Sequence, residues 1–376
     1  MATGWQEIQQ KTYYFGDSGE VVIGWRIVDG ERYYFADDGA MLTGWQELGG
    51  IRYCFDEEGH FLTGWHTVDE KLYYFTDAGK TLTGWQTLEE KACYFTDEGY
   101  ALIGWQTLDG QNYYFSEDGY AHTGWLQEES ATYYLNEKGQ PLTGWQTVEE
   151  KQYYFADNGA MTVGWLSLDG DRYYFRENGV MAVGEVTIDG VKSFFTSKGK
   201  YVLLVNHKVP VPADFRLNLV WYQGAQIHQD AKDPLDAMIN ACKAAGHSLW
   251  INNIYRNASF QQYLWNRSVN SYRARGYSYE RARELAATVA MLPNYSEHQT
   301  GLAVDLNGGS SCYNWLAEHC WEYGFILRYP EGKTDYTGVI HEPWHFRYVG
   351  TELALELRDL GLCMEEYMQM LTQKNG

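Results

Sequence analysis

The stretch Gly104-Trp105-Gln106-Thr107-Leu108-Asp109-Gly110-Gln111-Asn112-Tyr113-Tyr114-Phe115 decides the fold of the first half of the chain. Two segments rich in aromatic and aliphatic residues flank an Asp-Gly pair, which supplies the positive φ angles of a tight hairpin turn. The pattern therefore predicts two short antiparallel strands, over 104–108 and 112–115. A lone two-stranded hairpin cannot bury enough apolar surface to be stable, so such a unit must share a core with its neighbours.

The same unit recurs along the chain. Gly-Trp appears nine times at a constant spacing of 20 residues, from Trp5 to Trp165, and a tenth unit has Glu185 in the Trp position. The aromatic triplet keeps the same phase, and a glycine follows four residues after each triplet. A period of this length is typical of stacked supersecondary repeats. We therefore expect an all-β hairpin-repeat solenoid over residues 1–203, built from about ten units of 20 residues and elongated in shape.

The repeated aromatic residues are candidates for ligand binding. Side chains alternate across a strand, so one tyrosine of each Tyr-Tyr pair faces outward, beside the Gly-Trp indole. Such aromatic faces, surrounded by Asp and Glu, suit a cationic headgroup through cation–π attraction or a sugar ring through stacking. About half of the aromatic residues must instead fill the thin core. The candidate binding residues are Trp25, Tyr34, Trp45, Trp65, Tyr74, Trp85, Trp105, Tyr114, Trp125, Trp145, Tyr154 and Trp165.

These units resemble the cell-wall-binding repeats of Gram-positive surface proteins, which include choline-binding modules, glucan-binding repeats and the repetitive tails of clostridial toxins. The resemblance implies an extracellular, wall-associated protein whose repeats bind choline-decorated teichoic acid or another wall glycan. Choline-binding members usually carry an extra Trp just before the Tyr-Tyr pair. This chain has other residues there, such as Thr12, Arg32 and Leu72, so both ligands stay open.

The charge distribution separates two halves and excludes some functions. The chain of 376 residues has a formal net charge of −21, and residues 1–200 alone hold 32 acidic and 14 basic side chains. Such an acidic molecule is repelled by phosphate backbones, which excludes nucleic acid as a partner. No window approaches about 18 consecutive apolar residues, so we expect no transmembrane segment. Met1-Ala-Thr-Gly-Trp lies within a repeat and no signal peptide is present, which we interpret as a mature or trimmed form of an exported protein.

Residues 204–376 predict a separate α+β domain. Asp233-Pro234 has the residues of a helix start and Gly246 those of its end, with a strand following over 249–255. Further helices are expected near 259–275, 278–291 and 313–323, and from Thr351 and Glu365.

The segment Ser296-Glu297-His298-Gln299-Thr300-Gly301-Leu302-Ala303-Val304-Asp305-Leu306 contains the first candidate metal ligands. On a strand, Leu302, Val304 and Leu306 point into a core, whereas Gly301, Ala303 and Asp305 point the other way. Two small residues beside a carboxylate predict an open pocket floor. His298 lies just before the strand and can turn back toward Asp305.

The segment Ile340-His341-Glu342-Pro343-Trp344-His345-Phe346-Arg347-Tyr348-Val349 contains the second group. Its His-Glu-x-x-His pattern is that of helical zinc proteases. Pro343 and the β-branched and aromatic flanking residues oppose a helix here. As an extended segment it directs His345 and Arg347 to one face and Trp344, Phe346 and Tyr348 to the other.

Together these residues predict a catalytic zinc site. Such a site needs three protein ligands and an open position, and His298, Asp305 and His345 provide the three, for one Zn²⁺ per domain. Glu342 is the expected general base, which would take a proton from the water that attacks an amide carbonyl. Arg256 is the expected cation for the oxyanion.

This constellation resembles the zinc D-alanyl-D-alanine carboxypeptidases of the VanY group and the related L,D-carboxypeptidases, over roughly residues 203–350. Further matching residues are Tyr255-Arg256 and Tyr323-Gly-Phe-Ile-Leu-Arg-Tyr-Pro330. The resemblance implies that Gln261 and Ser296 contact substrate, beside the metal ligands, Glu342 and Arg256. Around Arg256 the chain departs from the family, with Asn253-Ile254-Tyr255-Arg256-Asn257 in place of Ser-Gly-Tyr-Arg-Ser.

Three functional hypotheses follow. The first is a wall-anchored zinc carboxypeptidase that removes the terminal D-Ala from peptidoglycan stem peptides, with D,D and L,D specificity both open. The second is an endopeptidase that cuts within cross-links, and the third is a wall-binding adhesion protein with an inactive enzyme domain. The six cysteines include no Cys-x-x-Cys pair, and any disulfide is expected to involve Cys242 or Cys363.

Overall fold

The computed structural model describes residues 2–375 and divides into two compact units, which meet at Thr162 and Val163. The predicted boundary at 203/204 marks the end of the repeats instead. The last two repeats therefore belong, structurally, to the C-terminal unit.

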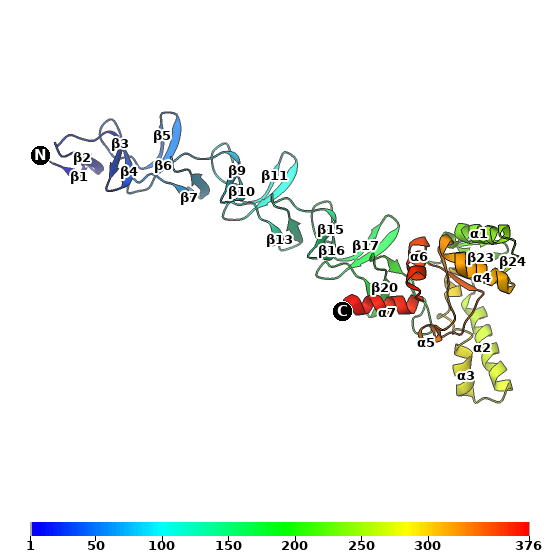
Figure 1. The fold of residues 1–376 in the computed structure, drawn as a ribbon. Helices are drawn as coiled ribbons and strands as arrows, with labels where there is room; N and C mark the ends of the chain where they lie inside the picture. The colour runs from blue at the N-terminus through cyan, green and yellow to red at the C-terminus, as the bar shows by residue number, and fades with distance from the viewer. Residues whose placement is uncertain (1, 376) are drawn as a thin grey trace. The chain divides into compact units, whose positions relative to one another are not determined.

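Hairpins form the whole repeat region. Among the described residues, the strands from β1 to β20 pair consecutively into ten antiparallel hairpins (Figure 1). In the N-terminal unit they are β1 (Gly4–Ile8), β2 (Lys11–Phe15), β3 (Gly24–Val28), β4 (Glu31–Phe35), β5 (Gly44–Leu48), β6 (Ile51–Phe55), β7 (Gly64–Val68), β8 (Lys71–Phe75), β9 (Gly84–Leu88), β10 (Lys91–Phe95), β11 (Gly104–Leu108), β12 (Gln111–Phe115), β13 (Gly124–Gln127), β14 (Thr132–Leu135), β15 (Gly144–Val148) and β16 (Lys151–Phe155).

The turn geometry agrees with the sequence pattern. Asp109 and Gly110 have φ angles of 51° and 76°, as the tight turn between β11 and β12 requires. Glu149 and Glu150 adopt 50° and 64° at the equivalent turn, so this turn forms even without glycine.

Within the N-terminal unit, aromatic side chains join successive hairpins. Trp25 of β3 lies opposite Tyr34 of β4, with ring centroids 5.1 Å apart. The same indole contacts Tyr53 at 5.2 Å and Phe55 at 5.9 Å in the following hairpin. The phenylalanine of the triplet is buried, as at Phe35, so each junction supplies the core that a single hairpin lacks.

The C-terminal unit begins with two more hairpins, formed by β17 (Gly164–Leu168), β18 (Asp171–Phe175), β19 (Gly184–Ile188) and β20 (Val191–Phe195), the last extended by β21 (Tyr201–Val202). The chain's last helix, α7 (Met364–Asn375), packs on β19. Phe194 shares a buried cluster with Met364, Tyr367 and Leu371 of that helix. This shared core explains why the compact unit starts before the repeats end.

The remaining elements form an α+β domain, as predicted. A four-stranded antiparallel sheet has the order β24-β25-β27-β26, and a separate hairpin pairs β22 with β23. The elements are β22 (Leu219–Tyr222), β23 (Ala225–His228), α1 (Gln229–Ala244), β24 (Leu249–Asn253), α2 (Ala258–Ala274), α3 (Tyr279–Ala287), the 3₁₀ turn η1 (Glu297–Thr300), β25 (Ala303–Gly308), α4 (Ser310–His319), η2 (Cys320–Tyr323), β26 (Phe325–Leu327), α5 (Thr334–Thr337), β27 (His345–Tyr348) and α6 (Thr351–Leu360).

The main core lies on one face of this sheet. Val304 and Leu306 of β25 and Phe346 of β27 pack with Leu235 and Met238 of α1. The alternation predicted for both strands is therefore correct, and the opposite face of β25 and β27 is left for Asp305 and His345. No helix among residues 2–375 has the length and apolar character needed to cross a membrane.

Several predictions of detail need correction. The helix expected to start at Asp233 begins one turn earlier, at Gln229, because His228 caps it by accepting from the backbone N–H of Asp230. The strand expected over 249–255 ends at Asn253, and the helix expected over 278–291 ends at Ala287.

The sequence left the disulfide status open and limited any bridge to one involving Cys242 or Cys363. All six cysteines are free thiols. The sulfur atoms of Cys242 and Cys312 lie 3.6 Å apart within the core, at the face where α1 meets α4.

Candidate metal centre

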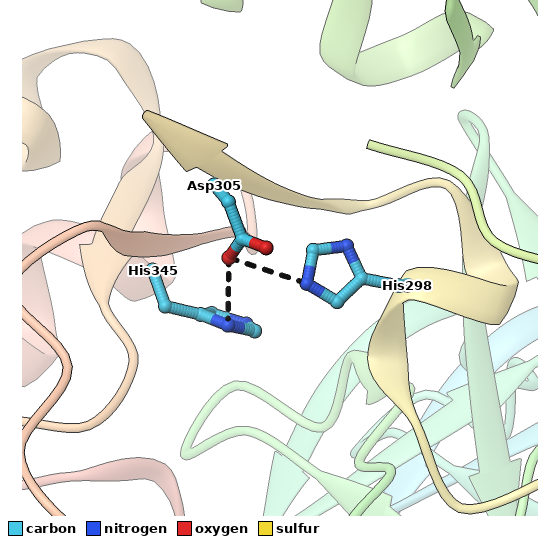
Figure 2. Close-up of side chains that lie close together, drawn as sticks. All are labelled: His298, Asp305 and His345. Atoms are coloured by element: carbon cyan, nitrogen blue, oxygen red, sulfur yellow. Dashed lines mark ion pairs between the residues drawn. The ribbon is translucent and has the colours of Figure 1, made fainter. Parts of the chain in front are cut away.

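Three side chains from separate segments converge at the end of the sheet (Figure 2). His298 comes from η1, Asp305 from β25 and His345 from β27, where Asp305 and His345 are register partners in adjacent strands. The Asp305 Oδ1 atom lies 3.3 Å from His298 Nε2 and 3.3 Å from His345 Nδ1. The candidate donor atoms of the three residues all lie within 4.8 Å of one another.

The surroundings of these atoms fit a bound cation. His298 Nε2 and Asp305 Oδ1 are buried and have no hydrogen-bond partner. Leaving such groups unsatisfied is costly, so an atom set of this kind favours a positive ion. Two imidazole nitrogens and one carboxylate oxygen match the three-ligand pattern of catalytic zinc.

His298 is held in the form that binds metal. Its Nδ1 atom lies 2.6 Å from the carbonyl oxygen of Ile254, to which it donates, leaving Nε2 with a free lone pair. Burial lowers the pKa of His298, which favours the neutral imidazole.

The predicted base and cation both lie beside this cluster. Glu342 Oε2 is 3.3 Å from His345 Nδ1, so its carboxylate lies at the candidate centre. Arg256 lies three residues after the end of β24 and forms an ion pair with Asp305 Oδ2, a contact that the sequence did not reveal. Its Nε–H has no partner, and its side chain lines the cavity over the metal ligands.

A buried carboxylate behind His345 was missed by sequence reasoning. Glu297 Oε2 lies 3.6 Å from His345 Nε2, on the side of the ring away from Asp305. Glu297 Oε1 accepts from Arg328 Nε at 2.8 Å and from Arg347 Nη1 at 3.1 Å. At 3.6 Å the two atoms are beyond hydrogen-bond distance, so Glu297 faces the outer side of the His345 ring as a buried negative charge.

The network continues to the last helix. Arg328 donates to both oxygens of Glu365 on α7, at 2.7 and 2.9 Å. Burial alone would raise the pKa of Glu365, but the charge and hydrogen bonds of Arg328 outweigh it and lower that pKa. Each of these pairs joins residues far apart in sequence, so the sequence did not indicate them. For Glu297 the one local signal was its position next to His298.

A cavity of about 480 Å³ opens over the cluster, lined by Arg256, Gln261, Ser296, Tyr329, Glu342 and Trp344 among others. Gln261 is almost fully buried and donates to the carbonyl oxygen of Met291, while its Oε1 has no partner. Ser296 is buried in the wall. The expected pocket floor of Gly301 and Ala303 is wrong, because Gly301 lies against Leu219 and His228, and neither residue lines this cavity.

The candidate ligand-binding aromatics of the repeats lie at the hairpin junctions. Most of the tryptophans are paired across their hairpin with the outward tyrosine, as in Trp65 with Tyr74, Trp105 with Tyr114 and Trp145 with Tyr154, whereas Trp45 is paired with Cys54. The most exposed of the predicted set keep 37 to 42% of their surface accessible, namely Trp25, Trp85, Trp125, Trp145 and Trp165.

Several of these rings already carry an internal cation. The guanidinium carbon lies 5.5 Å from the Trp25 ring centroid for Arg32, 3.9 Å from Trp45 for Arg52, and 4.3 Å from Trp165 for Arg172. By contrast, a small cavity beside Trp105 is lined by uncharged residues, including Tyr133, Asn112 and Asn158. The junctions are therefore chemically unequal although the repeat is regular.

Family comparisons agree with both halves of this description. A model of the VanY D-alanyl-D-alanine carboxypeptidase family matches residues 224–351, and a choline-binding repeat model matches 2–43, 22–61, 102–140 and 142–185. The chain is 39% identical over 174 residues to a D-alanyl-D-alanine carboxypeptidase of Enterococcus faecalis. That alignment covers 44% of this chain and 65% of the relative, so the chain spans less than two thirds of its length.

Two solved structures are each similar to part of this chain. A mutant of the vancomycin resistance D,D-pentapeptidase VanY in complex with Zn(II) is 39% identical, with 44% of this chain and 97% of that chain covered and a TM-score of 0.43. Choline binding protein F of Streptococcus pneumoniae is 28% identical, with 60% and 90% covered and a TM-score of 0.42.

The C-terminal domain thus combines a buried His-Asp-His cluster with a match to the VanY D-alanyl-D-alanine carboxypeptidase family. More specifically, the chain joins N-terminal choline-binding repeats to a C-terminal domain of the VanY D-alanyl-D-alanine carboxypeptidase type.

Proposed function

We propose that this protein is a zinc-dependent carboxypeptidase of the bacterial cell wall, which removes the terminal D-Ala from peptidoglycan stem peptides. The observation that carries the proposal is the buried cluster of His298, Asp305 and His345, in which His298 Nε2 and Asp305 Oδ1 have no hydrogen-bond partner and Glu342 lies beside His345 Nδ1. The match of residues 224–351 to the VanY family supports a D,D-carboxypeptidase over an L,D-enzyme.

The residues of the cavity divide the chemistry between them. When bound by His298, Asp305 and His345, zinc supplies a Lewis acid at the scissile amide. Glu342 accepts the proton of the attacking water and returns it to the leaving amine. Arg256 keeps one N–H group on Asp305 and offers others to the negative charge that develops on the carbonyl oxygen.

The test is mass spectrometry of defined pentapeptide and tetrapeptide stems, incubated with and without a chelator. Loss of a single D-Ala from the pentapeptide, abolished by chelator, is the expected result. Cleavage of the tetrapeptide instead would indicate L,D specificity, internal cleavage of cross-linked stems would indicate an endopeptidase, and no product from metal-loaded protein would contradict an enzymatic role.

We further propose that the repeats hold the enzyme on the wall outside the cell. Tethering raises the effective substrate concentration without altering the catalytic residues. Retention on purified walls should persist when residues 204–376 are deleted. Elution by free choline would identify choline-decorated teichoic acid as the ligand, whereas elution by soluble glycan alone would identify a wall glycan.

A further inference from the structure

The cavity over the metal centre extends well beyond the catalytic cluster, along helix α2. Its wall includes residues along one side of α2, starting at Gln261, and the residue that follows the helix. This set is called the α2 stripe. The stripe consists of Gln261, Leu264, Arg267, Ser268, Ser271 and Arg275.

The orientation of this stripe is fixed by packing on its opposite side. Trp265 and Val269 of α2 are buried against Ala282 and Ala286 of α3, so these two helices form a hairpin (Figure 1). Residues spaced by three or four along a helix share one face. Since the 265/269 face is occupied by α3, the face bearing Arg267, Ser271 and Arg275 is left to the cavity.

Charge is distributed unevenly along the cavity. Its carboxylates are Glu297, Asp305 and Glu342, all at the metal end, where Glu297 and Asp305 are paired with arginines. At the α2 end the charged lining residues are Arg267 and Arg275. Within residues 2–375 neither of these arginines has a carboxylate within ion-pair distance, although Arg275 lies 5.2 Å from the Tyr272 ring.

The distances suit a peptide that runs from the metal centre along α2. A helix rises about 1.5 Å per residue, which places Arg267 about 9 Å and Arg275 about 21 Å beyond Gln261. An extended peptide spans about 3.3 to 3.6 Å per residue. For a peptide whose scissile bond lies beside Gln261, a carboxylate about three residues before that bond would therefore reach Arg267, and one farther along would approach Arg275.

We propose that Arg267 and Arg275 form an anion subsite that recognises a free carboxylate on the amino-terminal side of the scissile bond. The substrate class is thus an acidic stem peptide, in preference to the same peptide with that carboxyl group amidated. This inference rests on the proposed function, because it assigns the direction of the peptide from the metal centre.

The experiment compares two pentapeptide stems that differ only in a carboxylate or carboxamide at the second residue. We expect the wild-type protein to prefer the acid by about three- to tenfold in kcat/KM, because solvated ion pairs contribute modestly. The Arg267→Gln/Arg275→Gln double variant should lose this preference through a higher KM, with the amidated peptide cleaved as before. The preference should also shrink at high salt, because exposed charges are screened.

Arg273→Gln is the matched control, because Arg273 lies over the Tyr279 ring and not in the cavity. An unchanged acid preference in the double variant, or an equal loss for both peptides, would overturn the subsite. If the zinc-loaded wild-type protein cleaves neither peptide, the proposed function fails separately. Titration calorimetry then measures the affinity of the wild-type protein and the double variant for the same two peptides. Tighter binding of the acid that is lost in the double variant supports the subsite, and its absence contradicts it.

Discussion

The repeat region and the candidate metal centre differ in how often each functional residue occurs along the chain. The repeats present nine tryptophans in equivalent hairpins, and within the N-terminal unit similar aromatic contacts join one hairpin to the next. The metal centre takes its three donors from positions 298, 305 and 345, each present once. Loss of one tryptophan should therefore weaken binding by the repeats only partly, whereas loss of one ligand should abolish metal binding at the candidate metal centre.

The largest effect should come from the metal centre itself. His298→Ala should remove both zinc and activity, because only two ligands remain. Glu342→Gln should retain zinc and lower kcat by about 10²- to 10⁴-fold, as expected for loss of a general base. Metal analysis beside the stem-peptide assay separates the two variants, and full activity in either would refute the assignment.

A smaller effect is expected one contact farther out. Glu297→Gln removes the carboxylate that faces His345 Nε2 and should weaken zinc affinity about 10- to 100-fold. Competition with a chromogenic chelator measures this. The control Glu322→Gln changes an exposed carboxylate on η2 and should leave zinc affinity unchanged, so equal affinities in the two variants would argue against a positioning role for Glu297.

The next prediction concerns stability and its dependence on pH. Glu365→Gln should lower the free energy of unfolding by about 3 kcal/mol at pH 7, because Arg328 loses a buried partner. The folded-state pKa of Glu365 is lowered, so its contribution is present above the ordinary carboxyl pKa and lost as pH falls through the folded value. Denaturant unfolding should therefore show the gap between wild type and variant closing toward acid pH. A gap that stays constant, or one equal to that of the exposed Glu331→Gln, would contradict this account.

The smallest effect should come from the repeats. Trp105→Ala opens an uncharged junction and should weaken retention on purified walls about threefold. Trp45→Ala should have less effect, because Arg52 covers the Trp45 ring and the Trp45 Nε1–H already donates to Asp69 at 3.1 Å. Circular dichroism of both variants checks that the hairpins persist. If Trp45→Ala weakened binding as much as Trp105→Ala, the junctions would be equal after all.

The sequence predicts those parts of the structure that depend on local pattern. The hairpins follow from alternation and turn residues within 12 positions, and the facing of Val304, Asp305 and His345 follows from strand periodicity. The candidate metal ligands could be proposed because each lies in a dense motif, and the structure brings all three together.

What could not be predicted depends on which distant groups come into contact. Arg256 on Asp305, Glu297 behind His345, and Glu365 on Arg328 are contacts across 37 to 49 residues of sequence. Nothing in the local sequence around Glu365 distinguishes it from a solvated helix residue. The start of α1 was misjudged for a related reason, since His228 had no recognisable capping signature.

The bond between Glu365 and Arg328 has a practical consequence for anyone who isolates the C-terminal domain. A fragment cut at residue 351, where the family match stops, would discard α6 and α7 and expose the apolar surface beneath them. It would also leave the buried Arg328 guanidinium without its Glu365 partner. Arg328 is in direct contact with Glu297, the carboxylate that faces His345. The ion-pair network behind the candidate metal ligands thus includes residues outside the family match. The smallest active fragment should therefore extend to α7.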